Sequence, residues 1–178
     1  MSRVEELEDR LRLLVNFGGV VSKETNLTRL LELIAEQVKA IVSCDRCSVF
    51  ILDRHTNELW SKVALGMQHT EIRVPFGKGI AGHVASSGQI INIQDAYQDH
   101  RFSHDLDRLT GYRTRSILAA PLKNVSGHII GVFEAMNKPG GFNVDDEGIL
   151  QLISSLAAAG IENAQLYEIL SKSQLETI

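Results

Sequence analysis

The sequence predicts an α+β fold, in which an antiparallel sheet of five or six strands has long N- and C-terminal helices on one face. Short helices are expected on the other face, over a concave space. Apolar residues recur every three or four positions near both ends of the chain, as in amphipathic helices. Between these ends the apolar period changes to two, as in half-buried strands. A run of apolar and small residues at 80–85 is predicted to lie in a short helix over 80–86. Around it stand glycines that let the backbone turn tightly, namely Gly77, Gly79, Gly82 and Gly88.

Composition restricts the classes of protein to which the chain can belong. Its 178 residues fit one domain with helical extensions, and 44% hydrophobic residues are enough for a core. The net charge of −4, without a cluster of basic residues, argues against a nucleic-acid surface. The N-terminus lacks an apolar signal region, and no apolar run approaches the ~20 residues of a membrane-spanning helix. We therefore expect a cytoplasmic protein with neither nucleic acid nor membrane as a partner.

The two cysteines, Cys44 and Cys47, form a Cys-x-x-Cys motif. A zinc site would need a second pair of ligands, and a redox site would need a helix N-terminus. This motif instead enters a predicted strand, and the sequence has no second pair, so we expect two reduced thiols.

Two helices are predicted before the first strand. Residues 3–15 have a helical stripe with heptad character, formed by Val4, Leu7, Leu11 and Leu14. Gly18 and Gly19 are predicted to interrupt this helix. A second helix follows, with Asn26 as its N-cap and one apolar face that contains Leu30, Leu31, Ile34, Val38 and Ile41.

Strands are predicted where the apolar period is two, at residues 47–53, 59–65, 70–76, 90–93, 116–123 and 128–137. The first two and the last two form hairpins, turned at RHTNE and NVSG. A short helix is predicted at 103–111, with Ser103 as cap and Gly111 as stop, and a long helix is predicted from 145 to about 170.

The start of the predicted helix 80–86 is one candidate binding site. The first N–H groups of a helix lack intrahelical partners and attract anions. The surrounding glycines have neither the spacing of a P-loop nor that of a dinucleotide-binding fold. An ordinary crossover from loop to helix to strand is the alternative interpretation.

Glu134 is a second candidate. Alternation places it on one face of the last strand with Ile130, Val132 and Met136. A carboxylate among apolar neighbours either lies at a strand edge facing water or accepts hydrogen bonds from a ligand N–H or hydroxyl.

Asp107, Thr110 and Thr114 form a third candidate, a polar cluster near a helix end, with capping and solvation as the alternative. The six histidines are scattered, and no third ligand stands at a recognisable spacing from His100 and His104. No paired nucleophile and base stands out either. We therefore predict neither a metal site nor catalytic residues.

Three stretches of the chain resemble one family. They are GKGIAGHVASSGQIINIQDAYQDHRF, TGYRTRSILAAPLKN and GVFEAMNK. With the residues that follow, they are similar to GAF domains, above all to the cyclic-nucleotide-binding GAF domains of phosphodiesterases and cyanobacterial adenylyl cyclases, over about residues 27–165. The family's structural motif falls on Asn137, Lys138, Phe142, Asp146 and Glu147, with a shorter spacer before the Phe than is usual.

The resemblance implies a GAF/PAS-like six-stranded antiparallel sheet with a ligand held under the short helices. By position, it implies ligand contacts from Ser48, Ile80, Ala81, Asp107, Thr110, Thr114 and Glu134. Ala64 and Leu65 complete the expected ligand-binding set. They stand where cyclic-nucleotide binders carry an aromatic residue and an acid that hold the purine, and this is the main departure from the family pattern. The motif also leads us to expect a salt bridge between Lys138 and Asp146.

From the resemblance we expect a regulatory sensor domain of a larger signalling protein that binds a small molecule, cAMP or cGMP, and has no catalysis of its own. The alternative is a ligand-free module for dimerisation and signal relay. The expected divisions are 1–22 for an N-terminal helix, 23–165 for the GAF domain and 166–178 for a connector helix to a covalently attached output domain. We also expect a homodimer through the terminal helices, based on the stripe in 3–15 and on Ile161, Ala164, Leu170, Leu175 and Ile178.

Overall fold

The computed structural model describes residues 2–61 and 71–175. The helices are α1 (Arg3–Lys23), α2 (Leu27–Val42), α3 (Gly79–Ser87), α4 (Asp105–Thr110) and α5 (Val144–Leu175), with a 3₁₀ turn, η1 (Ala96–Gln98). The strands are β1 (Arg46–Asp53), β2 (Glu58–Ser61), β3 (Ile72–Pro75), β4 (Ile91–Ile93), β5 (Ile117–Lys123) and β6 (Ile129–Met136).

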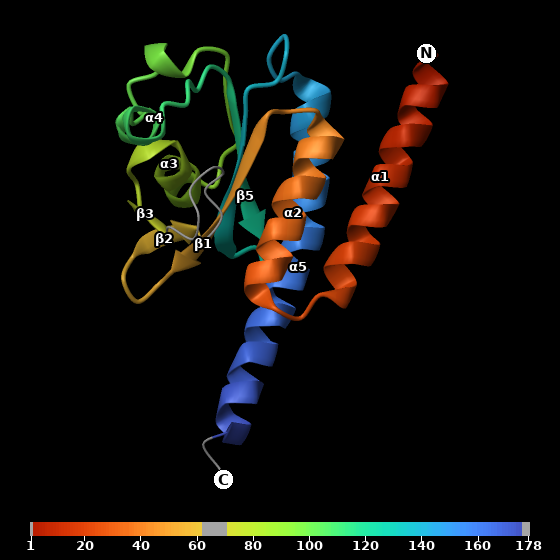
Figure 1. Cartoon of the computed structure of the whole chain (residues 1–178), viewed down its shortest axis with the longest axis vertical. Coiled ribbons are helices and arrows are strands. Elements are labelled where there is room, and N and C mark those ends of the chain that lie inside the picture. The colour runs from red at the N-terminus through yellow and green to blue at the C-terminus, as the bar shows by residue number, and fades with distance from the viewer. Residues whose placement is uncertain (1, 62–70, 176–178) are drawn as a thin grey trace.

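The strands form one six-stranded sheet in the order β3-β2-β1-β6-β5-β4, and every neighbouring pair is antiparallel. Figure 1 shows α2 and α5 side by side on one face of this sheet, with α1 outside them, and α3 and α4 on the opposite face. The predicted α+β architecture is therefore confirmed. β1 and β6 lie at the centre, and their residues reach the layers on both faces.

Alternation along the central strands divides the interior into two apolar clusters. On the helical face, Val49 and Phe133 pack with residues of α2 and α5. On the opposite face, Phe50 and Val132 pack with Ile80 and other residues of α3. Adjacent positions on one strand thus belong to different layers, as the pleat of a strand requires.

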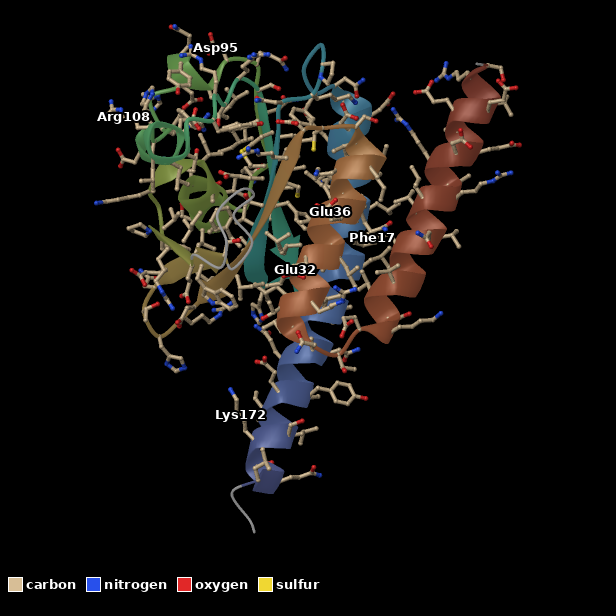
Figure 2. The ribbon with its side chains drawn as sticks, in the orientation of Figure 1. Phe17, Glu32, Glu36, Asp95, Arg108 and Lys172 are labelled. Atoms are coloured by element: carbon tan, nitrogen blue, oxygen red, sulfur yellow. The ribbon has the colours of Figure 1, made fainter. Side chains whose placement is uncertain are left out.

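The prediction that Gly18 and Gly19 interrupt the first helix was wrong, because α1 continues through both glycines to Lys23. A glycine in a helix costs about 1 kcal/mol relative to alanine. The continued helix buries Phe17 and Val21 in the helical-face core, which outweighs that cost. Figure 2 shows Phe17 between α1 and the α2–α5 pair.

The side chains of the apolar helical stripe predicted at 3–15 are mostly exposed to solvent. Val4, Leu7 and Leu11 are each more than half exposed, whereas Leu14 packs against the core. On α5, the expectation that Ile161 and Ala164 form a free apolar edge was wrong, because both are fully buried in the helical-face core.

Smaller corrections concern the last strands and the fourth helix. Ile130 packs against the helical-face core instead of sharing the face of Glu134, because β6 contains an irregularity at which Leu122 pairs with Gly131 and Lys123 with Ile129. The helix predicted at 103–111 begins at Asp105, and Ser103 does not occupy its N-cap position. Its predicted stop is confirmed, with Gly111 at φ 71°.

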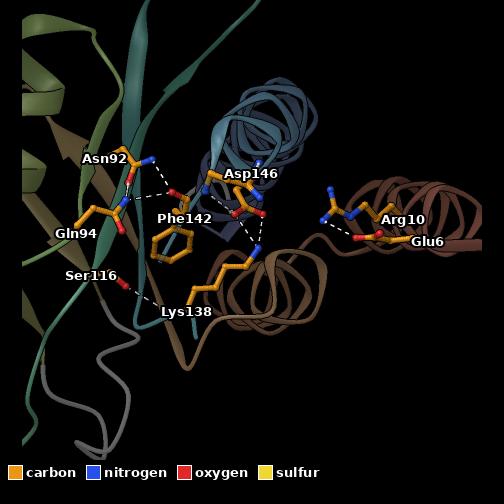
Figure 3. Close-up of polar contacts among 9 residues, drawn as sticks. Glu6, Arg10, Asn92, Gln94, Ser116, Lys138, Phe142 and Asp146 are labelled. Atoms are coloured by element: carbon orange, nitrogen blue, oxygen red, sulfur yellow. Dashed lines mark hydrogen bonds and ion pairs between the residues drawn. The ribbon is translucent and has the colours of Figure 1, made fainter. Parts of the chain in front are cut away.

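The family motif connects the end of β6 to the start of α5. Lys138 Nζ lies 2.6 Å from Asp146 Oδ1, so the predicted salt bridge is present. Asn92 Nδ2 donates to the carbonyl of Phe142 at 3.1 Å (Figure 3). It also donates to Glu147 at 2.8 Å, and the two bonds attach the motif to β4. Both cysteines are unpaired and buried. Within the residues described, no helix is long and apolar enough to cross a membrane.

Candidate functional site

A cavity of about 530 Å³ lies between the sheet and the two short helices α3 and α4. This volume falls in the range of roughly 300–1,000 Å³ that is typical of small-molecule sites. Its floor comes from β1 and β6, through Ser48, Phe50, Glu134 and Met136. The remaining walls come from β3, α3, α4 and the segment between α4 and β5.

The structure brings the predicted contact residues together. All seven that it describes line this cavity, and they come from β1, α3, α4, the segment before β5 and β6: Ser48, Ile80, Ala81, Asp107, Thr110, Thr114 and Glu134. The other two, Ala64 and Leu65, lie outside the described residues. That the seven residues contact a ligand stays a prediction.

The glycines around α3 are explained by close backbone approach. Gly77 and Gly79 adopt φ values of 80° and 65°, which favour glycine. A Cβ at Gly82 would lie 2.6 Å from the carbonyl oxygen of Pro75, so only glycine fits there without a backbone shift. Lys78 occupies the N-cap position of α3 without capping it through its side chain. The first residues of α3, including Ile80 and Ala81, line the cavity, so the first N–H groups of the helix lie at the cavity wall.

Asp107 holds α4 against the segment that leads into β5. Its carboxylate accepts hydrogen bonds from the N–H of Thr114 at 2.7 Å, from Thr114 Oγ1 at 2.7 Å and from Tyr97 Oη at 2.8 Å. The bond to Asp107 also raises the pKa of Tyr97. Asp107 is only 7% exposed and already has three donors, so its observed role is to position α4 above the cavity.

The sequence left open whether Thr110 belongs to a binding site or caps a helix, and the position of its side chain is compatible with both roles. Its hydroxyl donates to the carbonyl of Leu106 at 2.7 Å and accepts a bond from the N–H of Tyr112 at 3.3 Å, which stabilises the end of α4. The same side chain lines the cavity.

Glu134 lies in the middle of the sheet, so the alternative of a water-facing residue at a strand edge was wrong. It pairs with Ser48 on β1 and with Ala119 on β5. Burial raises the pKa of its carboxyl from the ordinary value of 4.5 to about 7, and a hydrogen bond from the backbone N–H of Ala81 partly offsets this rise. Glu134 is therefore an acid on the cavity floor that titrates near neutral pH.

Arg46 and Tyr112 are among the cavity residues that the sequence interpretation missed. The guanidinium carbon of Arg46 lies 3.7 Å from the centroid of the Tyr112 ring. The Tyr112 hydroxyl donates to Asp45 at 2.7 Å and accepts from Asn137 Nδ2 at 2.8 Å, and burial is the main cause that raises its pKa far above the usual range. Arg46 stands two residues before Ser48 on one strand, so alternation alone could have found it.

The arrangement offers binding groups of several kinds. It combines apolar walls, backbone N–H groups at the start of α3, hydroxyls, the carboxylates of Asp105, Asp107 and Glu134, and the stacked guanidinium of Arg46. Across residues 2–61 and 71–175, no group of three or more His, Cys, Asp or Glu side chains could hold a metal ion.

Comparisons with known proteins agree with this architecture. A model of the GAF domain family matches residues 26–161. The chain is similar to the dual 3',5'-cyclic-AMP and -GMP phosphodiesterase 11A of Takifugu rubripes, with 42% identity over 161 residues, covering 83% of this chain and 18% of that protein. It is also similar to the dual phosphodiesterase 11 of Drosophila melanogaster, with 38% identity over 186 aligned residues, covering 94% of this chain and 13% of that protein. The chain thus spans less than a fifth of the length of either relative.

Two solved structures share the fold. The GAF domain of a phosphoenolpyruvate-protein phosphotransferase from Coxiella burnetii superposes with a TM-score of 0.80 at 22% identity, over 94% of this chain and 99% of that one. The free methionine-R-sulfoxide reductase from Neisseria meningitidis superposes with a TM-score of 0.72 at 20% identity, over 89% and 91%. At these identities the similarity concerns the fold alone.

Proposed function

This chain belongs to the GAF domain family, and from that premise we propose that it is the regulatory sensor domain of a larger signalling protein. In this proposal it binds a cyclic nucleotide, cAMP or cGMP, in the cavity under α3 and α4. The observation that carries the proposal is the convergence of seven residues, chosen from the sequence and spread over positions 48–134, on one cavity of ligand size.

The chemistry of the cavity suits a nucleoside phosphate. Apolar side chains such as Phe50 and Ile117 offer surface to a purine ring. The N–H groups at the start of α3 can receive a phosphate, whose negative charge the helix dipole stabilises by roughly 0.3–2 kcal/mol. Ser48, Thr110 and Glu134 can bond to ribose hydroxyls or base N–H groups.

The chain's part in a longer protein is to relay the signal, not to catalyse a reaction. Its relatives are named as phosphodiesterases that act on cAMP and cGMP, and it matches only a small part of each. We propose a covalently attached output domain in a cytoplasmic protein. α5 extends well beyond the sheet (Figure 1), which makes it the natural connector.

We also propose that the domain is a parallel homodimer through α1 and α5. On α5, exposed residues recur at spacings of four and three over 152–170, in a row called here the α5 seam: Leu152, Leu156, Ala159, Asn163, Leu166 and Leu170. This is the a/d spacing of a coiled coil, in which a single polar Asn specifies register. The exposed Val4, Leu7 and Leu11 of α1 add a second apolar surface.

Calorimetry on nucleotide-free protein tests the binding proposal. We expect heat of binding with cAMP, cGMP or both. Ser48→Leu would fill the cavity floor and remove binding, whereas Ser126→Leu, in the exposed turn between β5 and β6, would leave binding unchanged. A folded wild-type protein that gives no heat with either nucleotide at millimolar concentration would support the ligand-free relay module instead.

A further inference from the structure

A second hollow, of about 690 Å³, lies at one end of the sheet. Residues next to four strand ends line it, because β1 and β5 begin at this end of the sheet, and β4 and β6 finish there. Among the described residues, it shares only Tyr112 with the cavity under α3 and α4. Three basic side chains line it, Arg113, Arg115 and Lys138, and it is called here the basic groove.

The segment before β5 is held so that two arginines face this groove. Asn137 Nδ2 donates to the carbonyl of Arg113 at 2.8 Å, and Asn137 Oδ1 accepts from the N–H of Arg115 at 2.7 Å. Between them, Thr114 is buried, lines the cavity and bonds to Asp107. The exposed residues on either side of it, Arg113 and Arg115, both line the groove. Their positions therefore follow from backbone bonds that are already made.

Neither of these guanidiniums is neutralised by a carboxylate. In the part of the chain that the structure describes, no Asp or Glu oxygen lies within 4.0 Å of the side-chain nitrogens of Arg113 or Arg115, whereas Lys138 pairs with Asp146. The guanidinium carbon of Arg113 lies 3.9 Å from the centroid of the Tyr97 ring. Stacking of this kind restrains the side chain and leaves its N–H groups for an acceptor. The groove thus has two positive charges without an acidic partner.

Ser116 adds a hydroxyl to the groove. It is only 4% exposed, and its oxygen accepts from the N–H of Lys138 at 3.3 Å (Figure 3). Within the described residues, its own hydrogen has no acceptor at hydrogen-bond distance. The carboxylate of Asp45 also lines the groove, but it already accepts a bond from Tyr112 at 2.7 Å. Two guanidiniums and one hydroxyl are therefore available to the oxygens of a ligand.

We propose that the basic groove is a second binding site, which takes the phosphate group of a small phosphorylated molecule. The inference goes beyond the proposed function, because it requires no nucleotide in the cavity. The fork of N–H donors on a guanidinium matches phosphate oxygens, and such charge-assisted bonds are roughly twice as strong as neutral ones. A phosphate monoester carries a charge of about −1.5 to −2 at pH 7, which suits two unpaired guanidiniums. A carboxylate has one charge and two oxygens, so it can use fewer of these donors.

Glycine signals in nuclear magnetic resonance separate the two sites in the full 178-residue chain. Gly111, Gly140 and Gly141 line the groove, whereas Gly79 lines the cavity. With glycine labelled selectively, the probes are inorganic phosphate, glycerol phosphate, acetate and chloride, each titrated at equal ionic strength. We expect both phosphate compounds to shift the groove signals to saturation, acetate to bind more weakly and chloride to produce no saturable shift. Because the site is open to solvent, the affinity should fall as salt is added.

Arginine variants test whether the shifts come from the groove. Arg113→Gln and Arg115→Gln each remove one guanidinium and should weaken phosphate binding by about tenfold. Arg115→Lys keeps the charge and loses the planar fork, so it should recover only part of the affinity. Arg12→Gln is the matched control, since Arg12 is an exposed arginine of α1, and it should bind phosphate as wild type does.

The outcomes separate this site from the cavity. Saturable shifts of the groove glycines with either phosphate compound support the proposal, and tighter binding of glycerol phosphate identifies a phosphorylated small molecule as the ligand. The proposal is overturned if chloride shifts these signals as phosphate does, if Arg12→Gln loses as much affinity as Arg115→Gln, or if no probe shifts them at millimolar concentration. Phosphate that moves Gly79 alone would also overturn it, by placing the anion at the start of α3. A cyclic nucleotide that moves Gly79 supports the proposed function whatever the groove binds.

Discussion

Lys138 Nζ lies 2.6 and 2.7 Å from the two carboxylate oxygens of Asp146, and this pair joins the end of β6 to the first turn of α5. The side chain of Asp146 is 1% exposed and that of Lys138 is 16% exposed. Asp146 and Asn143 also bond to each other's backbone N–H, both at 3.0 Å. The pair therefore has both the charge and the hydrogen bonds that a largely buried ion pair needs.

Replacing Asp146 with alanine should lower the free energy of unfolding by roughly 3–5 kcal/mol, because Lys138 would keep a buried charge without a partner. Thermal melting followed by circular dichroism measures this. Asp145→Ala is the matched control, since Asp145 is the preceding residue, is exposed and belongs to the same helical turn. Its loss should stay within about 1 kcal/mol. An unchanged melting temperature for Asp146→Ala would show that the pair is not structural.

Gly160 and Gly148 of α5 should respond in opposite directions to alanine. A Cβ at Gly160 would meet the Val21 side chain of α1, whereas one at Gly148 would meet nothing within 4 Å. Gly160→Ala should therefore destabilise by roughly 1–3 kcal/mol through overpacking. Gly148→Ala should stabilise by up to about 1 kcal/mol, because alanine favours the helix. Chemical denaturation gives both values, and a Gly160→Ala protein as stable as wild type would contradict the close approach of α1 to α5.

The proposed dimer should depend on the α5 seam. Leu166→Lys places a charge on this seam and should yield a monomer in light scattering at tens of micromolar protein. Val125→Lys is the control, because Val125 is fully exposed in the turn between β5 and β6. Removing residues 1–15 should weaken the dimer and leave the core folded, since Phe17 and Val21 remain. A monomeric wild type would rule out a stable dimer through these helices.

The stability of the protein should fall between pH 5 and pH 8 because of Glu134. The pKa of this carboxyl is raised in the folded state, so the folded protein holds a proton that the unfolded chain has released. Its contribution is fully present below the unfolded pKa of 4.5 and is lost as the pH rises through about 7. The difference is on the order of 2–3 kcal/mol. Denaturation at several pH values, compared between wild type and Glu134→Gln, measures it. A parallel pH profile for the two proteins would be evidence against a buried titrating Glu134.

The sequence was sufficient for the order and type of most elements and for seven of the residues that line the cavity. Period-two patterns located the strands, and glycine positions located α3 and the end of α4, because both signals depend on local geometry. The family resemblance supplied Ser48, which is far in sequence from the polar cluster of Asp107, Thr110 and Thr114 yet lines the same cavity. Alternation alone could also have supplied Arg46, two residues before Ser48, and this signal was not used.

What the sequence could not supply depends on tertiary contacts. The continuation of α1 through Gly18 and Gly19 depends on the burial of Phe17, which no local propensity encodes. The face of Ile130 depends on an irregularity in the pairing of β5 with β6. The bonds from Tyr97 and Thr114 to Asp107 depend on how the segment before β5 folds over α4. In each case the deciding partner lies elsewhere in the chain or in another element.

The pairing of Ser48 with Glu134 has a further consequence for folding. Their neighbours on the same two strands, Cys47 with Ala135 and Val49 with Phe133, face the helical layer. A slip of one residue between β1 and β6 would turn an entire strand over. If β6 were the strand turned over, the carboxyl of Glu134 would enter an interior of α2 and α5 side chains, and Phe133 would face the cavity. Desolvating an unpaired carboxylate costs several kcal/mol, so misaligned pairings are unstable. The acid on the cavity floor therefore also fixes the alignment in which the two central strands come together.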